Sequence, residues 1–150
     1  MTALVWTLRP ATADDRDFVV GVNRSAMGPY LEATFGWDHA AASAYFDERF
    51  DASGGQVIEV DGADVGELLV DERPGELSLV RVALLPEWQG RGVGSAIVRM
   101  LIERAREQGS ALTLDVFKAN PRAMQLYESL GFVRVGETET DVSMRLEPKL

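Results

Sequence analysis

Apolar and polar residues alternate along this chain in two periods, one typical of strands and one typical of helices. Short apolar runs bounded by turn residues predict strands at about 4–9, 56–60, 65–70, 76–85, 112–117, 132–135 and 141–146. Apolar residues at helical spacing predict helices at about 12–26, 38–50, 93–108 and 120–130. This order of elements is typical of a three-layer α/β fold with a mixed central sheet.

Residues that start or stop helices mark the boundaries of these elements. Gly28-Pro29 is expected to break the first helix, and residues 30–37 are expected to form an aromatic-rich connection. Asp38 is a candidate N-cap of the second helix, and Gly109 is a candidate C-terminal cap of the third. No repeat, low-complexity tract or long linker divides the chain, so we expect one domain over residues 1–150.

The composition is typical of a globular domain outside the membrane. Of the 150 residues, 46% are hydrophobic and 26% are charged, which is sufficient for a full core. No apolar run approaches the length of a membrane-spanning helix, and the N-terminus lacks a signal-peptide pattern. We therefore expect a cytoplasmic protein without a membrane partner. The absence of cysteine excludes disulfides, thiolate metal sites and a cysteine nucleophile.

The formal net charge of −9 narrows the range of partners. General nucleic-acid binding requires a basic face, so no nucleic-acid partner is expected. An acidic protein attracts cationic amines, although the same charge also serves solubility alone. His39 is the single histidine, and the sequence contains no cluster with metal-ligand spacing, so no metal is expected.

The most informative segment lies between the apolar run 77–85 and the helical pattern that follows it. This segment contains Gln89-Gly90-Arg91-Gly92-Val93-Gly94. A strand, a glycine-rich turn and a helix start suit a phosphorylated ligand, because glycines allow a close approach and first-turn amides point at the anion. The spacing G-x-G-x-G followed by Ser95-Ala96 fits neither a Walker loop nor a dinucleotide-binding fingerprint.

Two motifs resemble those of the GNAT superfamily, the acyl-CoA-dependent N-acyltransferases. Gln89-x-x-Gly92-x-Gly94 is similar to the superfamily's pyrophosphate-binding signature. Residues 120–132, NPRAMQLYESLGF, resemble its N-x-x-A-x-x-L-Y-E-x-x-G-F segment. The match covers residues 77–132 and implies a three-layer α/β/α fold with a mixed, mostly antiparallel central sheet. The resemblance further implies that this sheet is splayed at the acetyl-CoA site, with a bulge near residues 83–85.

The resemblance assigns a set of residues to acetyl-CoA, which would serve as co-substrate. Backbone groups of the strand before the glycine loop would hold the pantetheine arm, and loop amides would hold the pyrophosphate. The Leu84 amide would polarise the thioester carbonyl. Asn120, which is also a candidate helix N-cap, would contact the pantetheine. The full set is Val82, Ala83, Leu84, Gln89, Gly90, Arg91, Gly92, Val93, Gly94, Ser95 and Asn120.

The resemblance also implies residues for the proton transfers. Tyr127 would be the general acid that protonates the departing thiolate, and it lies seven residues after Asn120, on the same helix face. Asp115 is a candidate general base acting through water, because acetyltransferases of ribosomal-protein N-termini use a Glu at the equivalent position. Glu67 and Glu32 are rival bases, and surface solvation explains Asp115 equally well.

The acceptor is expected to bind beside the variable connection after the first helix. An aromatic wall with an acid suits a cationic amine, although aromatic packing of a helix–helix loop explains the same residues. The candidates for contact with the acceptor are Tyr30, Glu32, Phe35, Trp37, His39 and Glu67.

Together these residues predict an N-acetyltransferase that moves an acetyl group from acetyl-CoA to a primary amine of a small molecule or peptide, by direct transfer in a ternary complex. The alternatives are a protein N-terminal or lysine acetyltransferase and a non-catalytic acyl-CoA-binding regulatory module. Ser78 stands where the histone acetyltransferases have a Glu, which argues against a histone substrate. Homodimers are common in the superfamily, but no dimer motif is readable here.

Overall fold

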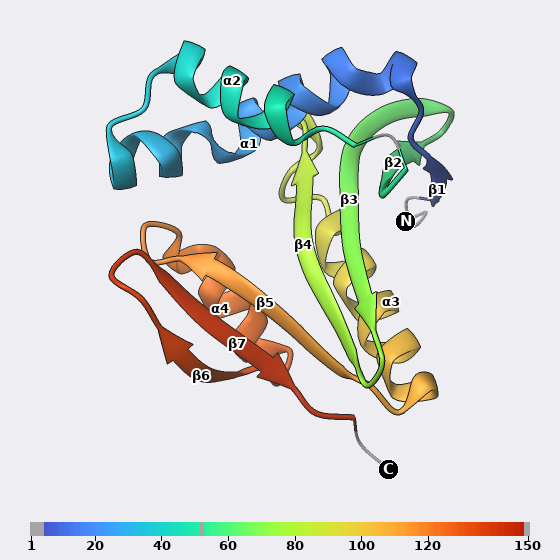
Figure 1. Ribbon diagram of the computed structural model, residues 1–150. Coiled ribbons are helices and arrows are strands. Elements are labelled where there is room, and N and C mark those ends of the chain that lie inside the picture. The colour runs from blue at the N-terminus through green and yellow to red at the C-terminus, as the bar shows by residue number, and fades with distance from the viewer. Residues whose placement is uncertain (1–4, 52, 149–150) are drawn as a thin grey trace. The chain divides into compact units, whose positions relative to one another are not determined.

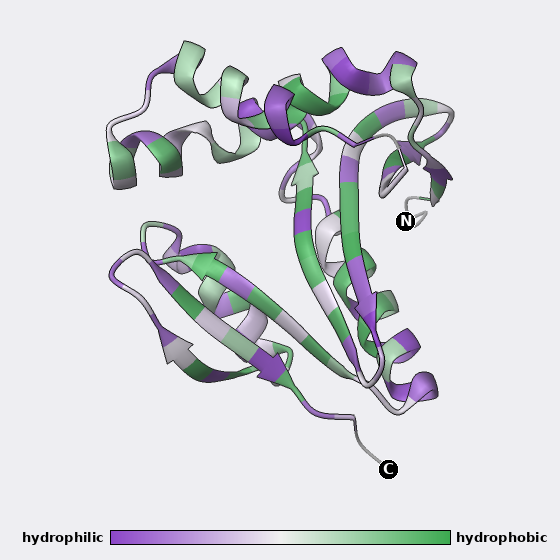
Figure 2. Cartoon of the chain, in the orientation of Figure 1, coloured by the Kyte–Doolittle hydropathy of each residue, from purple (hydrophilic) through white to green (hydrophobic). Residues whose placement is uncertain are grey.

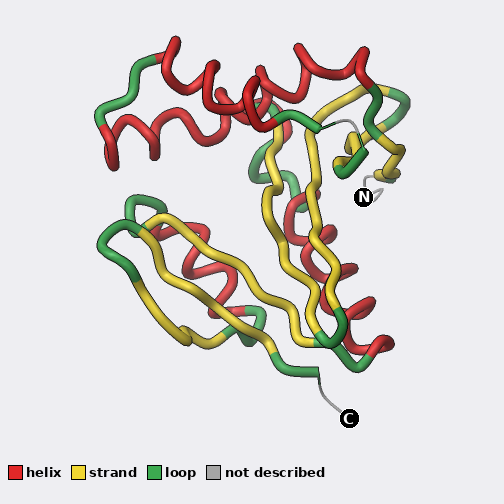
Figure 3. Tube along the Cα trace, viewed as in Figure 1, coloured by secondary structure: helices red, strands yellow, loops and turns green. Residues whose placement is uncertain are grey.

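A computed structural model describes residues 5–51 and 53–148 (Figure 1). The order of strands and helices is the predicted one, as Figure 3 shows along the chain. The strands are β1 (Trp6–Pro10), β2 (Gly55–Val60), β3 (Ala63–Arg73), β4 (Glu76–Leu84), β5 (Ala111–Phe117), β6 (Val133–Glu137) and β7 (Asp141–Leu146). The helices are α1 (Arg16–Phe35), α2 (His39–Arg49), α3 (Val93–Gln108) and α4 (Pro121–Ser129), with 3₁₀ turns η1 (Ala13–Asp15) and η2 (Pro86–Trp88).

The strands form one seven-stranded sheet in the order β1-β2-β3-β4-β5-β7-β6. β4 and β5 run parallel, with residues 76–79 paired to residues 111–114. The pairs β1–β2, β2–β3, β5–β7 and β6–β7 are antiparallel. The predicted α/β class with a mixed, mostly antiparallel sheet is therefore confirmed, whereas the splay at the acetyl-CoA site stays a prediction.

The chain divides into two compact units, each assembled from separate segments. Among the described residues, the first unit contains 5–51, 53–69 and 81–94, and the second contains 70–80 and 95–148. β3, β4 and α3 each contribute residues to both units. The expectation of a single domain over 1–150 stays a prediction.

The first unit buries apolar residues of α1, α2 and its strands. α1 and α2 lie side by side, and each alternates between hydrophilic and hydrophobic segments (Figure 2). Val19 and Val22 of α1 are fully buried, as are Ile58 of β2 and Leu68 of β3. These helices therefore follow the amphipathic pattern that a core-facing helix requires.

The second unit has its core on α3, β5 and β7. Ile97 and Leu101 of α3 are fully buried, and so are Leu112 of β5 and Met144 of β7. Gly109 has a φ of 68°, the left-handed conformation that ends a helix without the steric penalty of a side chain. The predicted third helix and its glycine cap are thus confirmed.

The expected break of the first helix at Gly28-Pro29 is wrong. α1 continues through Pro29 and ends at Gly36, whose φ is 73° and whose N–H donates to the Glu32 carbonyl at 2.8 Å. Proline removes one hydrogen bond of the helix, but the turn that follows is retained because it buries Leu31. In the aromatic-rich connection expected over 30–37, residues 30–35 are consequently helical, and only residues 36 and 37 belong to the link between the helices.

Other predicted boundaries are close to the observed ones. Asp38 caps α2, because its carboxylate accepts a hydrogen bond from the Ala41 N–H at 2.9 Å. Asp61 and Gly62, expected as a tight turn, both have positive φ and join β2 to β3. The first strand was expected at 4–9; residue 4 lies outside the described residues, and β1 extends one residue further, to Pro10. Proline is tolerated there because β1 is an edge strand.

Candidate functional site

The glycine loop of the first unit has the backbone geometry that the motif predicts. Gly90 and Gly92 have φ values of 71° and 88°, a region that favours glycine. A β-carbon at either position would meet no atom within 4 Å, so open space adjoins the backbone of both. α3 begins directly afterwards at Val93, and its first-turn N–H groups are free of helix partners. The loop therefore offers a backbone cradle for an anion.

Side chains hold this loop in place. Gln89 Nε2 donates to the carbonyl oxygen of Leu84 at 3.0 Å, which ties the loop to the end of β4. The guanidinium of Arg91 lies 4.3 Å from the centroid of the Trp88 ring, a cation–π contact. Val93 is buried. Gln89, predicted to bind the cofactor, thus has a positioning contact of its own.

The strand pairing is irregular beside the end of β4. The register between β2 and β3 shifts between Ile58 and Glu59, so Val65 of β3 is an extra residue, which is a β-bulge. The carbonyl oxygen of Val65 accepts a hydrogen bond at 2.9 Å from the N–H of Leu85, the residue after β4. The bulge is therefore in β3, and the bulge expected near residues 83–85 stays a prediction.

Gly66 of β3 lies next to this bulge and against Ala83 and Leu84 of β4. A β-carbon on Gly66 would lie 2.3 Å from the Ala83 carbonyl oxygen and 2.8 Å from Leu84 Cδ2. No side chain fits there. Gly66 is not among the site residues predicted from sequence, although a glycine inside a predicted strand is a recognised sign of a bulge or of close backbone approach.

A buried polar network lies beside Gly66. Glu67 is 2% exposed, and its carboxylate accepts hydrogen bonds from Arg81 Nε at 3.0 Å and Arg81 Nη2 at 3.1 Å. Asn23 of α1 donates from Nδ2 to Glu67 Oε1 at 2.7 Å and to the Val19 carbonyl at 2.9 Å. The Asn23 Oδ1 atom is buried and has no hydrogen-bond partner. Glu67 was named as a rival base and acceptor contact; Asn23 and Arg81 were not named.

The second unit contains the second sequence motif, on α4. The Asn120 side chain caps this helix, since its Oδ1 accepts from the Ala123 N–H at 3.2 Å. Tyr127 is half-buried and packs edge-on against Phe132, with ring centroids 5.7 Å apart. Burial raises the pKa of the Tyr127 hydroxyl above its ordinary value of 10.0. This phenol therefore keeps its proton at neutral pH, as a general acid requires.

Asp115 and Asp141 share one face of the β5–β7 pair. The strand register places Asp115 opposite Ser143 and Phe117 opposite Asp141. Asp115 is exposed, and its carboxylate accepts a hydrogen bond from the Ser143 hydroxyl at 2.7 Å. The Oδ1 atom of Asp141 is buried and has no hydrogen-bond partner. Diagonal positions on such a pair are roughly 7–8 Å apart, so Asp115 and Asp141 are neighbouring residues on this face.

Asp141 did not appear among the candidates from sequence. No local motif marks it, because its position beside Asp115 depends on how β7 is aligned against β5. Only the pairing register brings the two residues onto a shared face.

Aromatic residues at the end of α1 and in the link after it pack against α2. The Trp37 ring lies 5.2 Å from Phe35 and 5.2 Å from Tyr45, measured between centroids. Arg49 lies over the Tyr45 ring at 3.6 Å. Phe35 and Trp37, two of the acceptor candidates, are thus in contact with each other. The alternative interpretation, aromatic packing of a helix–helix loop, predicts such a contact. Of the other acceptor candidates, Tyr30 and Glu32 lie on α1 rather than on a loop, and His39 begins α2.

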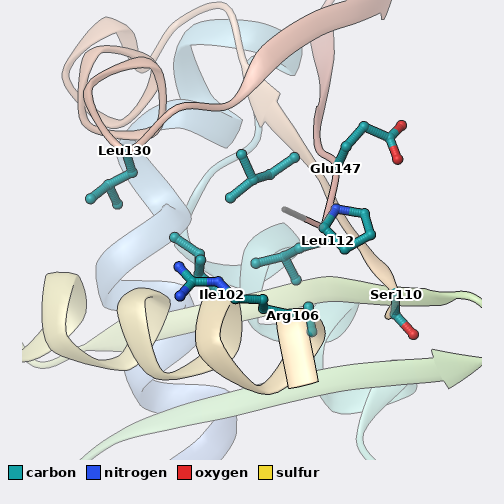
Figure 4. Close-up of a pocket in the computed structure, with 9 residues that line it drawn as sticks. Ile102, Arg106, Ser110, Leu112, Leu130 and Glu147 are labelled. Atoms are coloured by element: carbon teal, nitrogen blue, oxygen red, sulfur yellow. The ribbon is translucent and has the colours of Figure 1, made fainter. Parts of the chain in front are cut away.

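The second unit also contains a small cavity that no sequence motif predicts (Figure 4). It lies where the end of α3, the start of β5, the end of α4 and the segment after β7 meet. Its labelled lining residues are Ile102, Arg106, Ser110, Leu112, Leu130 and Glu147. None of them belongs to the predicted site.

Among residues 5–51 and 53–148, no group of three or more His, Cys, Asp and Glu residues is arranged to hold a metal ion. Within the same ranges, none of the helices has the length and apolar character needed to cross a membrane.

A known protein family has the fold and the two motifs described above. The model of the acetyltransferase (GNAT) family matches residues 23–132. This chain belongs to the GNAT family. The match includes both the glycine loop and the Asn120–Tyr127 helix, so the predicted family is confirmed.

Relatives with named substrates cover part of this GNAT chain. The [ribosomal protein bS18]-alanine N-acetyltransferase of Escherichia coli (strain K12) is 41% identical over 58 residues, which are 38% of this chain and 39% of that protein. The N-acetylaspartate synthetase of Danio rerio is 32% identical over 120 residues, which are 78% of this chain and 42% of that protein. The chain thus spans about two fifths of the length of these relatives.

Solved structures share the fold. The crystal structure of PaiA N-acetyltransferase from Thermoplasma acidophilum in complex with coenzyme A matches with a TM-score of 0.77 at 14% identity. The match covers 95% of this chain and 99% of that one. At this identity the likeness supports the fold alone.

Proposed function

We propose that this GNAT protein is an N-acetyltransferase that moves an acetyl group from acetyl-CoA directly to the primary amine of a small molecule or a peptide. The observation that carries the proposal is the glycine loop. Its left-handed Gly90 and Gly92 adjoin open space, directly before the first-turn amides of α3. This geometry suits the pyrophosphate of coenzyme A.

The residues of the first unit have the chemistry to bind the co-substrate. Acetyl-CoA supplies an activated thioester whose sulfur is a good leaving group. The loop amides and Arg91 would neutralise its phosphates, and backbone groups of residues 82–84 would hold the pantetheine arm as an added strand. The Leu84 N–H would polarise the thioester carbonyl, in the manner of an oxyanion donor.

The residues of the second unit have the chemistry to move protons. The Tyr127 hydroxyl, whose pKa burial raises above 10.0, is protonated at neutral pH, and it would donate that proton to the departing thiolate. Asp115 would take the proton of the attacking amine, through a bridging water molecule. The carboxylate of Asp141 on the same face would add to the negative field that attracts the ammonium form of the acceptor.

The acceptor class follows from this acidic face. A cationic primary amine complements two neighbouring carboxylates, whether it belongs to an amino acid, a polyamine or a peptide N-terminus. The named relatives acetylate ribosomal-protein alanine in one case and form N-acetylaspartate in the other, so both acceptor types occur among them. A protein N-terminal acetyltransferase is the alternative that the 41% identity over 58 residues favours.

Thiol release from acetyl-CoA in the presence of an amine panel tests the proposal. The panel contains polyamines, amino sugars, free amino acids and peptides with N-terminal alanine. We expect turnover with at least one cationic amine, and Asp141→Asn should raise its KM by about tenfold. The exposed Glu139 of the same hairpin provides a control, because Glu139→Gln should leave that KM unchanged.

Two results would contradict the proposal in different ways. Binding of acetyl-CoA without turnover on any amine would favour the non-catalytic regulatory module. An absence of acetyl-CoA binding would remove the transferase assignment itself.

A further inference from the structure

We propose that four residues, Asn23, Gly66, Glu67 and Arg81, act as a positioning device that holds residues 82–84 of β4 in the shape that binds the acyl-CoA. The inference rests on the proposed function, because it assumes that this segment contacts the pantetheine arm. It assigns to Glu67 a role other than that of base or acceptor contact. All four residues belong to the first unit.

The first part of the device fixes the start of the segment. Arg81 donates two parallel hydrogen bonds to the two oxygens of Glu67, at 3.0 and 3.1 Å. A bidentate pair of this kind fixes both the distance and the orientation of the guanidinium. Asn23 holds the same carboxylate from α1 at 2.7 Å. β4 is therefore tied at Arg81 to a neighbouring strand and to a helix.

The second part of the device shapes the segment itself. The Ala83 carbonyl oxygen lies so close to Gly66 that a β-carbon there would be 2.3 Å away. In a regular antiparallel pair the carbonyl points along the hydrogen-bond ladder and not at the α-carbon of the facing residue. The Ala83 carbonyl is thus directed at Gly66, beside the bulged residue Val65 of β3. Arg81 and Ala83 flank Val82, so both parts act on consecutive residues.

The chemistry of the network indicates a positional role in preference to a contribution to stability. A buried ion pair is commonly no more stabilising than apolar residues of the same volume, because both charges lose their hydration. Asn23 is 0% exposed and leaves Oδ1 without a partner, which is unfavourable in a core. The network therefore contributes little to the stability of the core. Its effect is to fix the position and the orientation of the Arg81 side chain.

The experiment replaces the ion pair with apolar residues, in order to distinguish an effect on the shape of residues 82–84 from an effect on the stability of the fold. In the double variant Glu67→Met/Arg81→Met, side chains of similar volume replace the pair, so the fold should be retained. We expect its Kd for acetyl-CoA, measured by titration calorimetry, to rise by about tenfold or more. The KM for acetyl-CoA should rise in parallel, while kcat at saturation should change far less, because the reacting groups themselves are untouched.

A second variant disturbs the Ala83 carbonyl and leaves the Glu67–Arg81 ion pair unchanged. Gly66→Ala places a methyl group against the Ala83 oxygen and should raise the Kd for acetyl-CoA while the ion pair remains. Arg81→Lys, which keeps the charge but not the two parallel bonds, should give an intermediate Kd. The surface pair Arg104–Glu72 supplies a matched control, since Glu72→Met/Arg104→Met should leave the Kd unchanged.

The outcomes are distinct. If the wild-type protein fails to bind acetyl-CoA, the proposed function falls. If the wild type binds and the folded Glu67/Arg81 double variant binds equally well, only the positioning role is overturned. Loss of the folded state in both the double variant and Gly66→Ala, seen by circular dichroism, would also overturn it, because the residues would then be structural.

Discussion

At the scale of single residues, environment decides which of several similar side chains can perform a given chemistry. Glu67 and Asp115 are both candidate bases by sequence, yet Glu67 is buried with both oxygens bonded to Arg81, whereas Asp115 is exposed and bonded to one hydroxyl. The oxygens of Glu67 are occupied by Arg81 and Asn23, whereas Asp115 is open to solvent and so to a bridging water molecule. We therefore propose Asp115, and not Glu67, for the proton transfer.

Tyr127→Phe tests the general acid. Phenylalanine keeps the edge-on contact with Phe132 and removes only the hydroxyl, so stability and the KM for acetyl-CoA should change little. We expect kcat to fall by about a hundredfold, the lower range for loss of a general acid. Thiol release at saturating acetyl-CoA and acceptor measures the effect. A kcat within twofold of the wild-type value would exclude Tyr127 from this role.

At the scale of elements, a helix and a strand each depart from the regular form that their sequence pattern predicts. α1 passes through Pro29 because the following turn buries Leu31 and because Gly36 supplies a better end. β3 carries an extra residue, Val65, opposite β2, and the adjacent Gly66 leaves room for the Ala83 carbonyl of β4. In both elements, long-range packing outweighs a local preference.

Pro29→Ala tests the energetic balance in α1. Alanine restores an N–H donor for the Ser25 carbonyl and removes the clash of the proline ring, although it also gives the unfolded chain more freedom. The net result should be a gain of about 1–2 kcal/mol in the free energy of unfolding, measured with urea. A loss of stability would mean that Pro29 itself contributes to the packing of α1.

At the scale of the whole molecule, the ion pairs of one arginine connect the N-terminal strand to other elements of the first unit. Arg9 of β1 donates to both oxygens of Asp15 at 2.9 Å and pairs with Asp64 at 3.1 Å. The hydrogen bonds from Arg9 lower the pKa of the Asp15 carboxyl from 3.8 to about 2. A lowered carboxyl pKa means that folding favours the ionised form, so this contribution to stability is present above pH 3.8 and is lost as the pH falls toward 2.

The pH dependence of unfolding tests this ion pair. The wild-type protein should be more stable than Asp15→Asn by about 2 kcal/mol at pH 6, from urea unfolding. The difference should shrink as the pH is lowered from 4 to 2, where Asp15 becomes protonated. A difference that stays constant over that pH range would show that Asp15 contributes through packing alone.

Much of this protein follows from its amino-acid sequence alone. The order of strands and helices, the glycine loop, the Asp38 and Asn120 caps and the GNAT family are all readable from residues adjacent in the chain. These signals are local: left-handed glycines, capping side chains and apolar periodicity act within a turn or two of backbone.

The tertiary structure alone decided the features that depend on distant residues. Asn23 and Glu67, 44 positions apart, meet through packing of α1 on the sheet, and Asp141 joins Asp115 only through strand register. α1 also continues past Pro29, because the turn that follows buries Leu31 in the core. A local pattern cannot determine such outcomes, because their energy comes from contacts that form only when the chain has folded.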